Sequence, residues 1–364
     1  MRVLVVNAGS SSLKLDVLED DDEVVASARV APVGRLRPGE LEGAVAGLGP
    51  IDAVGHRVVH GGTELTEPVL VDAGVRARLQ ELVDLAPLHQ PASLKALDEV
   101  GRLTPGVPVV ACFDTAFHAT LPPEASTYAI PAEWRERFSA RRFGFHGLSH
   151  AYAARRAAEL AGPPGGDLRV VTCHLGAGAS LSAVQGGRSR DTTMGFTPLE
   201  GLVMATRSGT VDPGLLLWLQ THGGLGAGEV ADALEHRSGL LALAGTDDTA
   251  AVVAEAIQGS DGPRLALAVY LHRLRAAIAA MVAAVGGLDA LVFTGGVGEN
   301  APAVREGAAH GLRFLGVVLD RDGNAAAGPD RDVTGAGSTV RVLVIRARED
   351  IEIARGVRAV LRRS

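Results

Sequence analysis

Apolar and polar residues follow the same pattern at two places in the chain. Residues 3–6 are an apolar run, small residues fill positions 8–12, and residues 13–17 alternate between apolar and polar side chains. Residues 169–184 repeat this plan, with small residues at 176–180. A strand, a turn of small residues and an alternating strand predict a β-hairpin. The two hairpins favour two similar α/β domains that face each other across a cleft, although such a repeat can arise by chance in a chain with 46 glycines.

The hairpin pattern disfavours two common nucleotide-binding folds. Rossmann and P-loop sites place a glycine-rich turn directly before a helix. After Lys14 the apolar positions instead recur at every second residue, which is the period of a strand. The glycine-bearing turns are therefore expected between strands.

The rest of the chain alternates between helical and strand-like segments. Helices are predicted at 75–85, 91–100, 149–161, 265–285 and 351–362, and strands at 107–113, 288–294 and 340–345. The strand at 288–294 leads into a Gly-Gly-x-Gly turn and then a helix, and residues 162–166 are the clearest linker-like break. These segments indicate an α/β protein.

Length and composition limit the classes of protein that are compatible with this chain. A chain of 364 residues suggests about two domains. Its 35 Lys and Arg against 42 Asp and Glu give a net charge of −7, which argues against a nucleic-acid or anionic-membrane binder. Two cysteines lie in apolar runs, as expected of buried thiols in a reducing compartment. No signal peptide is recognisable, and the apolar stretch near 276–285 is shorter than a membrane span, so a cytoplasmic protein is expected.

Arginine and histidine residues gather beside glycines and strand ends. Seven of the eleven histidines lie between His56 and His174, and Arg57 and Arg207 each precede a glycine turn. A guanidinium group offers a bidentate fork, and glycine lets backbone N–H groups approach, so this combination suits phosphates and carboxylates. The competing interpretation of a single Arg is a solvated surface charge, and we interpret His56 and His60 as structural.

Two kinds of cation site are conceivable. His146 and His150 have the i, i+4 spacing of zinc ligands, but no Glu follows His146 as in the H-E-x-x-H pattern, so zinc is disfavoured. Asp114 follows a buried strand and Glu349 precedes the last helix, which suits magnesium held by few carboxylates. For Glu349 the alternative is an acidic residue that complements the helix dipole.

Taken in order, the motifs resemble those of the acetate kinase family over nearly the whole chain. They are Asn7-Ala8-Gly9-Ser10-Ser11-Ser12-Leu13-Lys14, residues 56–62, 85–89, 113–118 and 144–147, His174-Leu175-Gly176, residues 191–202 and 206–209, the turn at 296–300, and Glu349 with residues 353–355. One glycine motif is weak, but this many in order is a specific signal.

The resemblance implies a fold, an activity and an assembly. The fold would be α/β, with two duplicated ribonuclease-H-like domains of the actin-like ATPase type around a nucleotide cleft. Residues 1–116 with 349–364 would form the first domain, and residues 117–348 the second, nucleotide-binding one. The activity would be Mg²⁺-dependent transfer of the ATP γ-phosphoryl group to acetate, with Mn²⁺ as an alternative metal and ADP as product. The family also implies a homodimer with no nucleic-acid or membrane partner.

The resemblance assigns roles by motif. Arg57 and Arg207 would bind the carboxylate and the transferring phosphoryl group, His146 would stabilise that group, and Asp114 would orient the carboxylate. Asn7 and Glu349 would hold the metal. The acyl pocket would be made by Val59, Leu88, His89, Phe145 and Pro198. The nucleotide would be bound by Asn7, Ser10, Ser12, Lys14, His174, Leu175, Gly176, Gly178, Asp248, Gly295, Gly296, Gly298 and Asn300.

The sequence departs from the family pattern on the nucleoside side, and rival functions remain. Where relatives usually carry Asp-x-Arg, this chain has Asp248 but Ala250, which leaves the nucleotide donor open. A propionate kinase is the alternative function, because acetate and propionate differ by one methylene, about 1–3 kcal/mol of discrimination. A nucleotide-dependent switch on the same fold is the alternative from another class, but a switch needs no carboxylate-binding arginine. A hydrolytic metalloenzyme is a more distant alternative.

Overall fold

The computed structural model describes residues 1–9, 12–87, 89–161, 167–326, 328 and 330–363. The chain divides into two compact units. Unit 1 comprises Met1–Ala119, Phe145–Tyr152 and Arg348–Ser364, and unit 2 comprises Thr120–Gly144 and Ala153–Ala347. The predicted linker at 162–166 lies outside the described residues.

Unit 1 is built on a six-stranded sheet with the order β3-β2-β1-β4-β6-β5. β1, β2 and β3 are antiparallel, β4 and β6 run parallel to β1, and β5 is antiparallel to β6. Its elements are β1 (Val3–Ala8), β2 (Leu13–Leu18), β3 (Val24–Val30), α1 (Glu40–Ala46), β4 (Ala53–Val58), β5 (Val69–Leu70), α2 (Ala73–Glu81), α3 (Gln90–Leu103), β6 (Val109–Phe113) and α15 (Glu349–Leu361).

Unit 2 repeats the topology of unit 1 strand for strand. Its sheet has the order β9-β8-β7-β10-β12-β11, with β7, β8 and β9 antiparallel, β7, β10 and β12 parallel, and β11 antiparallel to β12. The strands are β7 (Arg169–Leu175), β8 (Ala179–Gln185), β9 (Arg188–Thr192), β10 (Ala290–Thr294), β11 (Arg331–Asp332) and β12 (Arg341–Val344). This confirms the predicted duplicated α/β fold, since the two predicted hairpins are β1–β2 and β7–β8.

The helices of unit 2 are α4 (Pro123–Ser126), α5 (Ala132–Phe138), α7 (Pro213–Thr221), α8 (Ala227–His236), α9 (Gly239–Ala244), α10 (Thr249–Ile257), α11 (Asp261–Ala284), α12 (Gly295–Asn300), α13 (Pro302–His310) and α14 (Arg321–Ala325). α6 (Gly147–Ala161) begins in the part of the chain assigned to unit 1 and ends in unit 2.

α11 is the one helix of the described residues that is long and apolar enough to cross a membrane. The prediction that the apolar stretch near 276–285 is too short for a span is therefore wrong by length and composition. In the fold, however, α11 packs against β7, β8 and β9 and against α9, α10 and α13. Its buried residues, which include Tyr270, Leu274 and Ile278, lie about one helical turn apart, as expected of a helix that covers a sheet.

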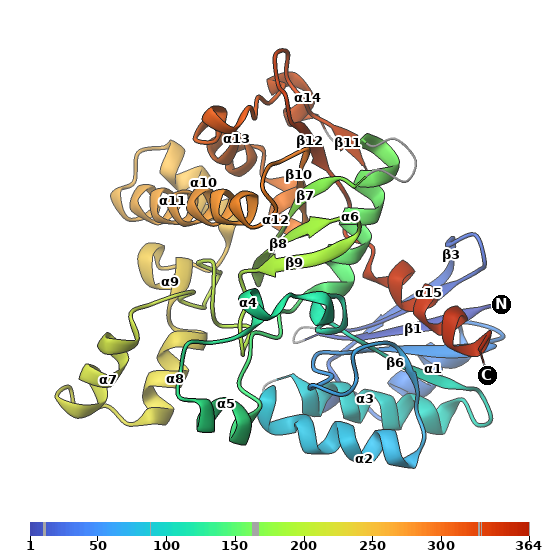
Figure 1. Ribbon diagram of the computed structural model, residues 1–364. Helices are drawn as coiled ribbons and strands as arrows, with labels where there is room; N and C mark the ends of the chain where they lie inside the picture. Colours follow the sequence, from blue (N-terminus) through green and yellow to red (C-terminus); the bar gives the residue numbers. More distant parts are fainter. Residues whose placement is uncertain (10–11, 88, 162–166, 327, 329, 364) are drawn as a thin grey trace. The chain divides into compact units, whose positions relative to one another are not determined.

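The last helix of the chain completes the sheet of unit 1. α15 packs against β1, β4 and β6 (Figure 1). The contact is so close that a Cβ atom on Gly55 would lie 2.6 Å from Ile353 Cγ2 and 2.7 Å from Val357 Cγ2. Arg355 and Arg358 donate to the Asp22 carboxylate at the tip of the β2–β3 hairpin, at 3.0 and 2.7 Å. Residues 333 and 336 positions apart in the sequence are thus joined in one unit.

Candidate functional site

Four predicted site residues form one hydrogen-bonded network in unit 1. β1, β4 and β6 are parallel, so their carboxyl ends share one edge of the sheet, where Asn7, Arg57 and Asp114 lie. Arg57 Nη2 donates to Asp114 Oδ2 at 2.6 Å, Arg57 Nε donates to Asp114 Oδ1 at 3.0 Å, and Arg57 Nη1 donates to Asn7 Oδ1 at 3.1 Å. Asn7 Nδ2 donates to Glu349 Oε2 at 3.1 Å. Glu349, the first residue of α15, is thereby joined to the sheet.

Burial and charge act against each other in this network. Asp114 is 1% exposed. Burial raises the pKa of its carboxyl group and Arg57 opposes that rise. Burial by itself would lower the pKa of Arg57, but Asp114 and Glu349 outweigh it, so the pKa of Arg57 is raised and the guanidinium stays protonated. The Arg57 guanidinium therefore stays a cation at the end of the sheet, held between Asp114 at 2.6 Å and Glu349 at 3.7 Å.

Asn7 and Glu349 fit the requirements of a magnesium ion. The amide of Asn7 and the carboxylate of Glu349 lie within hydrogen-bond distance of each other and both offer hard oxygen donors. Mg²⁺ is usually bound through one or two protein oxygens and keeps several waters. Within the described part of the chain, no group of three or more His, Cys, Asp and Glu side chains is placed to hold a metal ion.

His146 has an unusual backbone conformation. Its φ is +54°, in the left-handed region that residues other than glycine rarely adopt. Gly147 N donates to Asp114 O at 2.9 Å, and a Cβ atom on Gly147 would lie only 2.2 Å from that oxygen. The backbone at 146–147 is therefore held against the end of β6, and strain of this kind gathers at functional sites.

The residues of the predicted acyl pocket in unit 1 lie beside buried histidines. Phe145 is buried, its ring meets the His60 ring edge-on at 5.6 Å, and its carbonyl oxygen lies 3.0 Å from His118 Nε2. Val59 is buried next to His60. His89 is half-buried and precedes α3, and Leu88 lies outside the described residues.

His56 and His60 are both buried, in agreement with a structural role. Burial lowers the pKa of His56 to about 3 and that of His60 to about 4, so both are neutral at pH 7. Gly62 N donates to His60 Nδ1 at 2.8 Å. The Gln90 side chain accepts from His60 N at 3.2 Å and donates to His60 O at 3.1 Å, which joins the start of α3 to the segment after β4.

In unit 2, two glycine-bearing segments, 174–178 and 295–298, lie side by side. The turn at 176–178 is closed by Gly176 N, which donates to Gly178 O at 3.0 Å, and Ala205 N donates to Ala177 O at 3.2 Å. A Cβ atom on Gly176 would lie 3.9 Å from His174 Nε2 and 4.0 Å from Gly296 N. Gly295 has φ +78°, and a Cβ atom there would lie 2.7 Å from Leu175 O, so that position requires glycine. The predicted nucleotide residues His174, Leu175, Gly176, Gly178, Gly295, Gly296 and Gly298 therefore lie together.

Arg207 is held less tightly than Arg57. Its Nη1 donates to Pro198 O at 2.8 Å, and burial lowers its pKa, with Glu235 opposing. The loop that carries Pro198 is fixed by residues that the sequence did not single out. Glu200 accepts from Tyr128 Oη at 2.7 Å and from Arg142 Nη2 at 2.8 Å.

The remaining predicted residues are more dispersed. Asp248 is exposed and caps α10 by accepting from Ala250 N at 2.8 Å. Lys14 is exposed on β2, opposite Asn7 in the hairpin register. Asn300 Nδ2 donates to Gly296 O at 2.9 Å, a contact between the two ends of α12. Ser12 is half-buried at the start of β2, and Ser10 lies outside the described residues.

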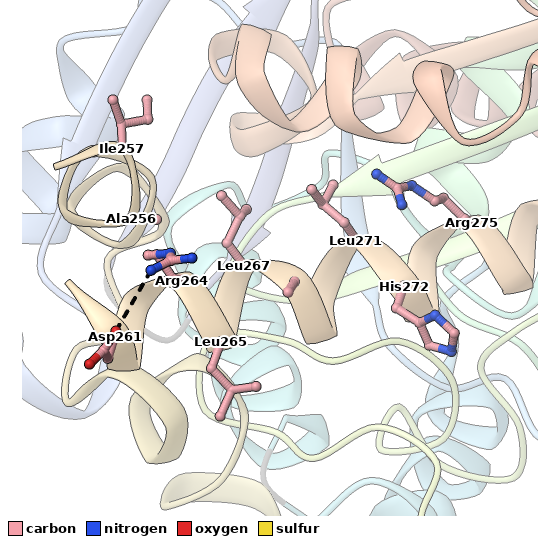
Figure 2. Close-up of a pocket in the computed structure, with 10 residues that line it drawn as sticks. Ala256, Ile257, Asp261, Arg264, Leu265, Leu267, Leu271, His272 and Arg275 are labelled. Carbon is pink, nitrogen blue, oxygen red and sulfur yellow. Dashed lines mark ion pairs between the residues drawn. The ribbon is translucent and has the colours of Figure 1, made fainter. Parts of the chain in front are cut away.

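A large pocket lies away from all of these residues. Its volume is about 890 Å³, and it lies along the α10–α11 pair of unit 2 (Figure 2). Leu267 and Leu271 line it together with Arg264 and Arg275, and Asp261 pairs with Arg264 at 3.7 Å at one end. It is an open surface groove with no predicted site residue in its wall. The presence of a large pocket therefore does not by itself identify the functional site.

Comparisons with known proteins cover nearly the whole chain. A model of the acetokinase family matches residues 42–355. An acetate kinase of Leifsonia xyli subsp. xyli is 47% identical over 385 aligned residues, which cover 97% of each protein. Among solved structures, an acetate kinase of Porphyromonas gingivalis superposes with a TM-score of 0.90 at 35% identity over 99% of both chains. A propionate kinase of Francisella tularensis subsp. tularensis gives the same TM-score of 0.90 at 32% identity and 99% coverage of both chains.

Proposed function

The chain belongs to the acetokinase family, and we propose that it is an acetate kinase that transfers the γ-phosphoryl group of ATP reversibly to acetate, giving acetyl phosphate and ADP. The observation that carries this proposal is the Arg57 network, in which a permanently charged guanidinium is fixed by Asp114 beside the Asn7–Glu349 pair. A short carboxylate and a phosphoryl group both need such a charge.

Phosphoryl transfer depends on alignment and charge neutralisation more than on covalent catalysis. Acetate is already ionised at pH 7, so no strong base is needed. Asp114 accordingly serves to orient: it occupies Nε and Nη2 of Arg57 and fixes the plane of the guanidinium. Arg57 then binds the carboxylate or the transferring phosphoryl group in direct in-line transfer.

Asn7 and Glu349 would hold Mg²⁺, directly or through water, and Mn²⁺ has similar ligand preferences. The ion supplies positive charge for the phosphate oxygens. On the protein's side, the Asn7–Glu349 hydrogen bond keeps both oxygens at the end of β1, so the site is organised before a nucleotide binds.

The remaining donors act on the phosphates and the nucleoside. His146 stabilises the transferring group, and its left-handed backbone conformation fixes the position from which the imidazole side chain extends. Arg207 is the second carboxylate and phosphoryl ligand. The turns at 176–178 and 295–298 offer backbone N–H groups to the ATP or ADP phosphates, with Ser10, Ser12, Lys14 and His174 as further ligands. Asp248 lies on the nucleoside side, where Ala250 leaves the purine preference open.

The acyl pocket distinguishes acetate from propionate only weakly. Val59 and Phe145 are buried apolar walls, and Leu88, His89 and Pro198 complete the proposed pocket. A propionate kinase is the second candidate, because one methylene changes the free energy by about 1–3 kcal/mol and a propionate kinase superposes as well as the acetate kinase does. A nucleotide-dependent switch would have no use for Arg57 and Arg207 as carboxylate ligands.

The test is to trap the acyl phosphate with hydroxylamine. The full chain is incubated with ATP and Mg²⁺ against acetate, propionate and butyrate, and the hydroxamate is measured. We expect most product with acetate. A larger kcat/KM with propionate would shift the proposal to propionate kinase, and ATP binding without hydroxamate from any acid would favour the switch.

The assembly and the domains are proposed on the family resemblance. We propose a homodimer in the cytoplasm with no nucleic-acid or membrane partner, and sedimentation should give about twice the 37.4 kDa of one chain. The proposed domains are residues 1–116 with 349–364, and 117–348. The compact units differ from them chiefly at Phe145–Tyr152, which belongs to unit 1.

A further inference from the structure

Arg305 is the largest fully buried side chain among the described residues, with 0% exposure. It belongs to α13, which follows α12 after a single residue. α12 begins with Gly295 and Gly296, two of the proposed phosphate ligands. A charged side chain of this size is rarely buried completely without a counter-ion, so the groups that bind the guanidinium have to account for its burial.

The guanidinium of Arg305 is bound by uncharged oxygens. Nη1 donates to Gly298 O at 2.8 Å and to Glu299 O at 2.9 Å, both at the C-terminal end of α12. Nε and Nη2 donate to Asn324 Oδ1 and Asn324 O, both at 2.7 Å. Arg305 therefore joins α12 to α14 and fixes the end of the glycine turn from within the core of unit 2.

Within the described part of the chain, no carboxylate is paired with this charge. The nearest acidic residue in sequence, Glu306, pairs instead with Arg321 at 2.9 Å. The Glu299 side chain accepts from Ala347 N at 2.9 Å. Burial and, to a smaller extent, the charge of Arg331 lower the pKa of Arg305 to about 10, so the group remains a cation at pH 7. A buried charge without a partner costs stability and extends its field further than an exposed one.

We propose that Arg305 is a positioning residue for the nucleotide, which holds α12 by its carbonyl groups and leaves a positive charge behind the glycine turn for the phosphates of a nucleoside di- or triphosphate. This rests on the proposed function only in taking that turn as the phosphate site. Arg305 contacts no phosphate itself, because it is fully buried. It acts through the backbone of Gly298 and through its field.

The experiment measures ADP binding by calorimetry in the presence of Mg²⁺, together with the KM values for ATP and acetate. In Arg305→Met we expect the Kd for ADP to rise about tenfold or more, equivalent to about 1.4 kcal/mol or more. The KM for acetate should change less than about twofold, since Arg305 lies in unit 2 behind the turn. Arg305→Lys keeps the charge without the fork and should recover part of the affinity.

Asn324→Asp tests the charge without removing Arg305. It keeps an acceptor for Nε, adds a negative charge and loses the Asn324 Nδ2 bond to Pro302 O at 3.0 Å. Asn324→Leu loses the same bond and also the Oδ1 acceptor for Arg305 Nε, but it adds no charge, and it is the uncharged comparison. We expect a larger rise in the Kd for ADP in Asn324→Asp than in Asn324→Leu.

The outcomes separate the inference from the proposed function. A folded Arg305→Met with wild-type ADP affinity overturns the inference, and so does equal ADP affinity of the two Asn324 variants. If Arg305→Met fails to fold, the Asn324 pair decides. If the wild type yields no hydroxamate but its ADP affinity depends on Arg305, the inference holds and the acetate kinase proposal fails.

Discussion

Arg57 and Arg207 are both proposed to bind negative charge, yet the protein holds the two guanidinium groups differently. Arg57 is paired with the buried Asp114 and hydrogen-bonded to Asn7. Among the described residues, the Arg207 side chain makes one hydrogen bond, to the carbonyl oxygen of Pro198. Removal of Arg57 leaves a buried carboxylate without its partner, whereas removal of Arg207 leaves one carbonyl group, so the two substitutions should differ in their effect on folding.

Arg207→Ala should lower kcat by about 10²–10³, the typical loss for one transition-state donor, with little change in the free energy of unfolding. Arg57→Ala is the comparison, and it should also cost about 3–5 kcal/mol of stability, as for a broken buried ion pair. Enzyme kinetics and urea unfolding measure both effects. Near wild-type turnover in Arg207→Ala would rule out its proposed role.

His56 should make the protein sensitive to mild acid. It is fully buried on β4, and burial lowers its pKa to about 3, below the value near 6.5 in the unfolded chain. The unfolded state therefore binds the proton first, so the stabilising effect is complete above pH 6.5 and is lost as the pH falls toward 3. Between pH 7 and 5 the loss should be about 2 kcal/mol.

His56→Leu removes this titration. When the pH is lowered from 7 to 5, the free energy of unfolding of this variant should fall by about 2 kcal/mol less than that of the wild type. Urea unfolding at pH 7 and pH 5 gives the comparison. The same loss in both proteins would show that His56 is not the group responsible.

At the scale of elements, the docking of α15 on the sheet depends on a glycine. Gly55 lies on β4 directly under Ile353 and Val357 of the helix. The helix also carries Glu349 at its first turn, so its position on the sheet sets the position of a proposed metal ligand. Arg348, directly before the helix, and Arg355 and Arg358 within it donate to Asp22 and so join the helix to the β2–β3 hairpin.

Gly55→Ala should destabilise unit 1 by about 1–3 kcal/mol, because the added methyl group overpacks a close contact. Gly101→Ala in α3 is the control. A Cβ atom there meets nothing within 4 Å, and alanine in a helix interior should stabilise by about 0.5–1 kcal/mol. Thermal unfolding measures the two shifts, and shifts of the same sign would contradict the docking argument.

The same scale shows why some elements could be predicted from sequence and others could not. The β1–β2 and β7–β8 hairpins follow from local alternation, and α15 and β10 differ from the predicted ranges by a few residues at most. The helices α7–α10 were not predicted, since glycines interrupt that region. Arg57 and Asp114 were predicted as separate residues, but their pairing depends on β4 and β6 being neighbours. Tyr128, Arg142 and Glu200 meet from distant positions, and no spacing rule indicates that contact.

At the scale of the whole molecule, the two units have the same sheet topology, but unit 1 is not formed by one continuous segment of the chain. Unit 1 needs residues from both ends of the sequence. Val357 and Ile353 are fully buried against its sheet, so a chain without α15 would expose one face of β1, β4 and β6. Unit 2 draws on residues that lie entirely between those ends.

A chain that ends at Ala347 should therefore lose the fold of unit 1 and retain that of unit 2. Hydrogen exchange should show lost protection in β1, β4 and β6 and normal protection in β7, β8 and β10. Full protection in both sheets would show that α15 is dispensable. The full-length chain, treated identically, is the reference.

The place of α15 at the end of the chain also bears on synthesis by the ribosome. Chains emerge from the N-terminus at about 5–20 residues per second, so the first strands of unit 1 wait roughly twenty seconds to a minute for the helix that covers them. Unit 2 is synthesised during that interval and is complete in sequence at Ala347, just before α15. The half of the protein that is translated first consequently cannot finish its fold until α15 has emerged, and until then one face of β1, β4 and β6 is uncovered.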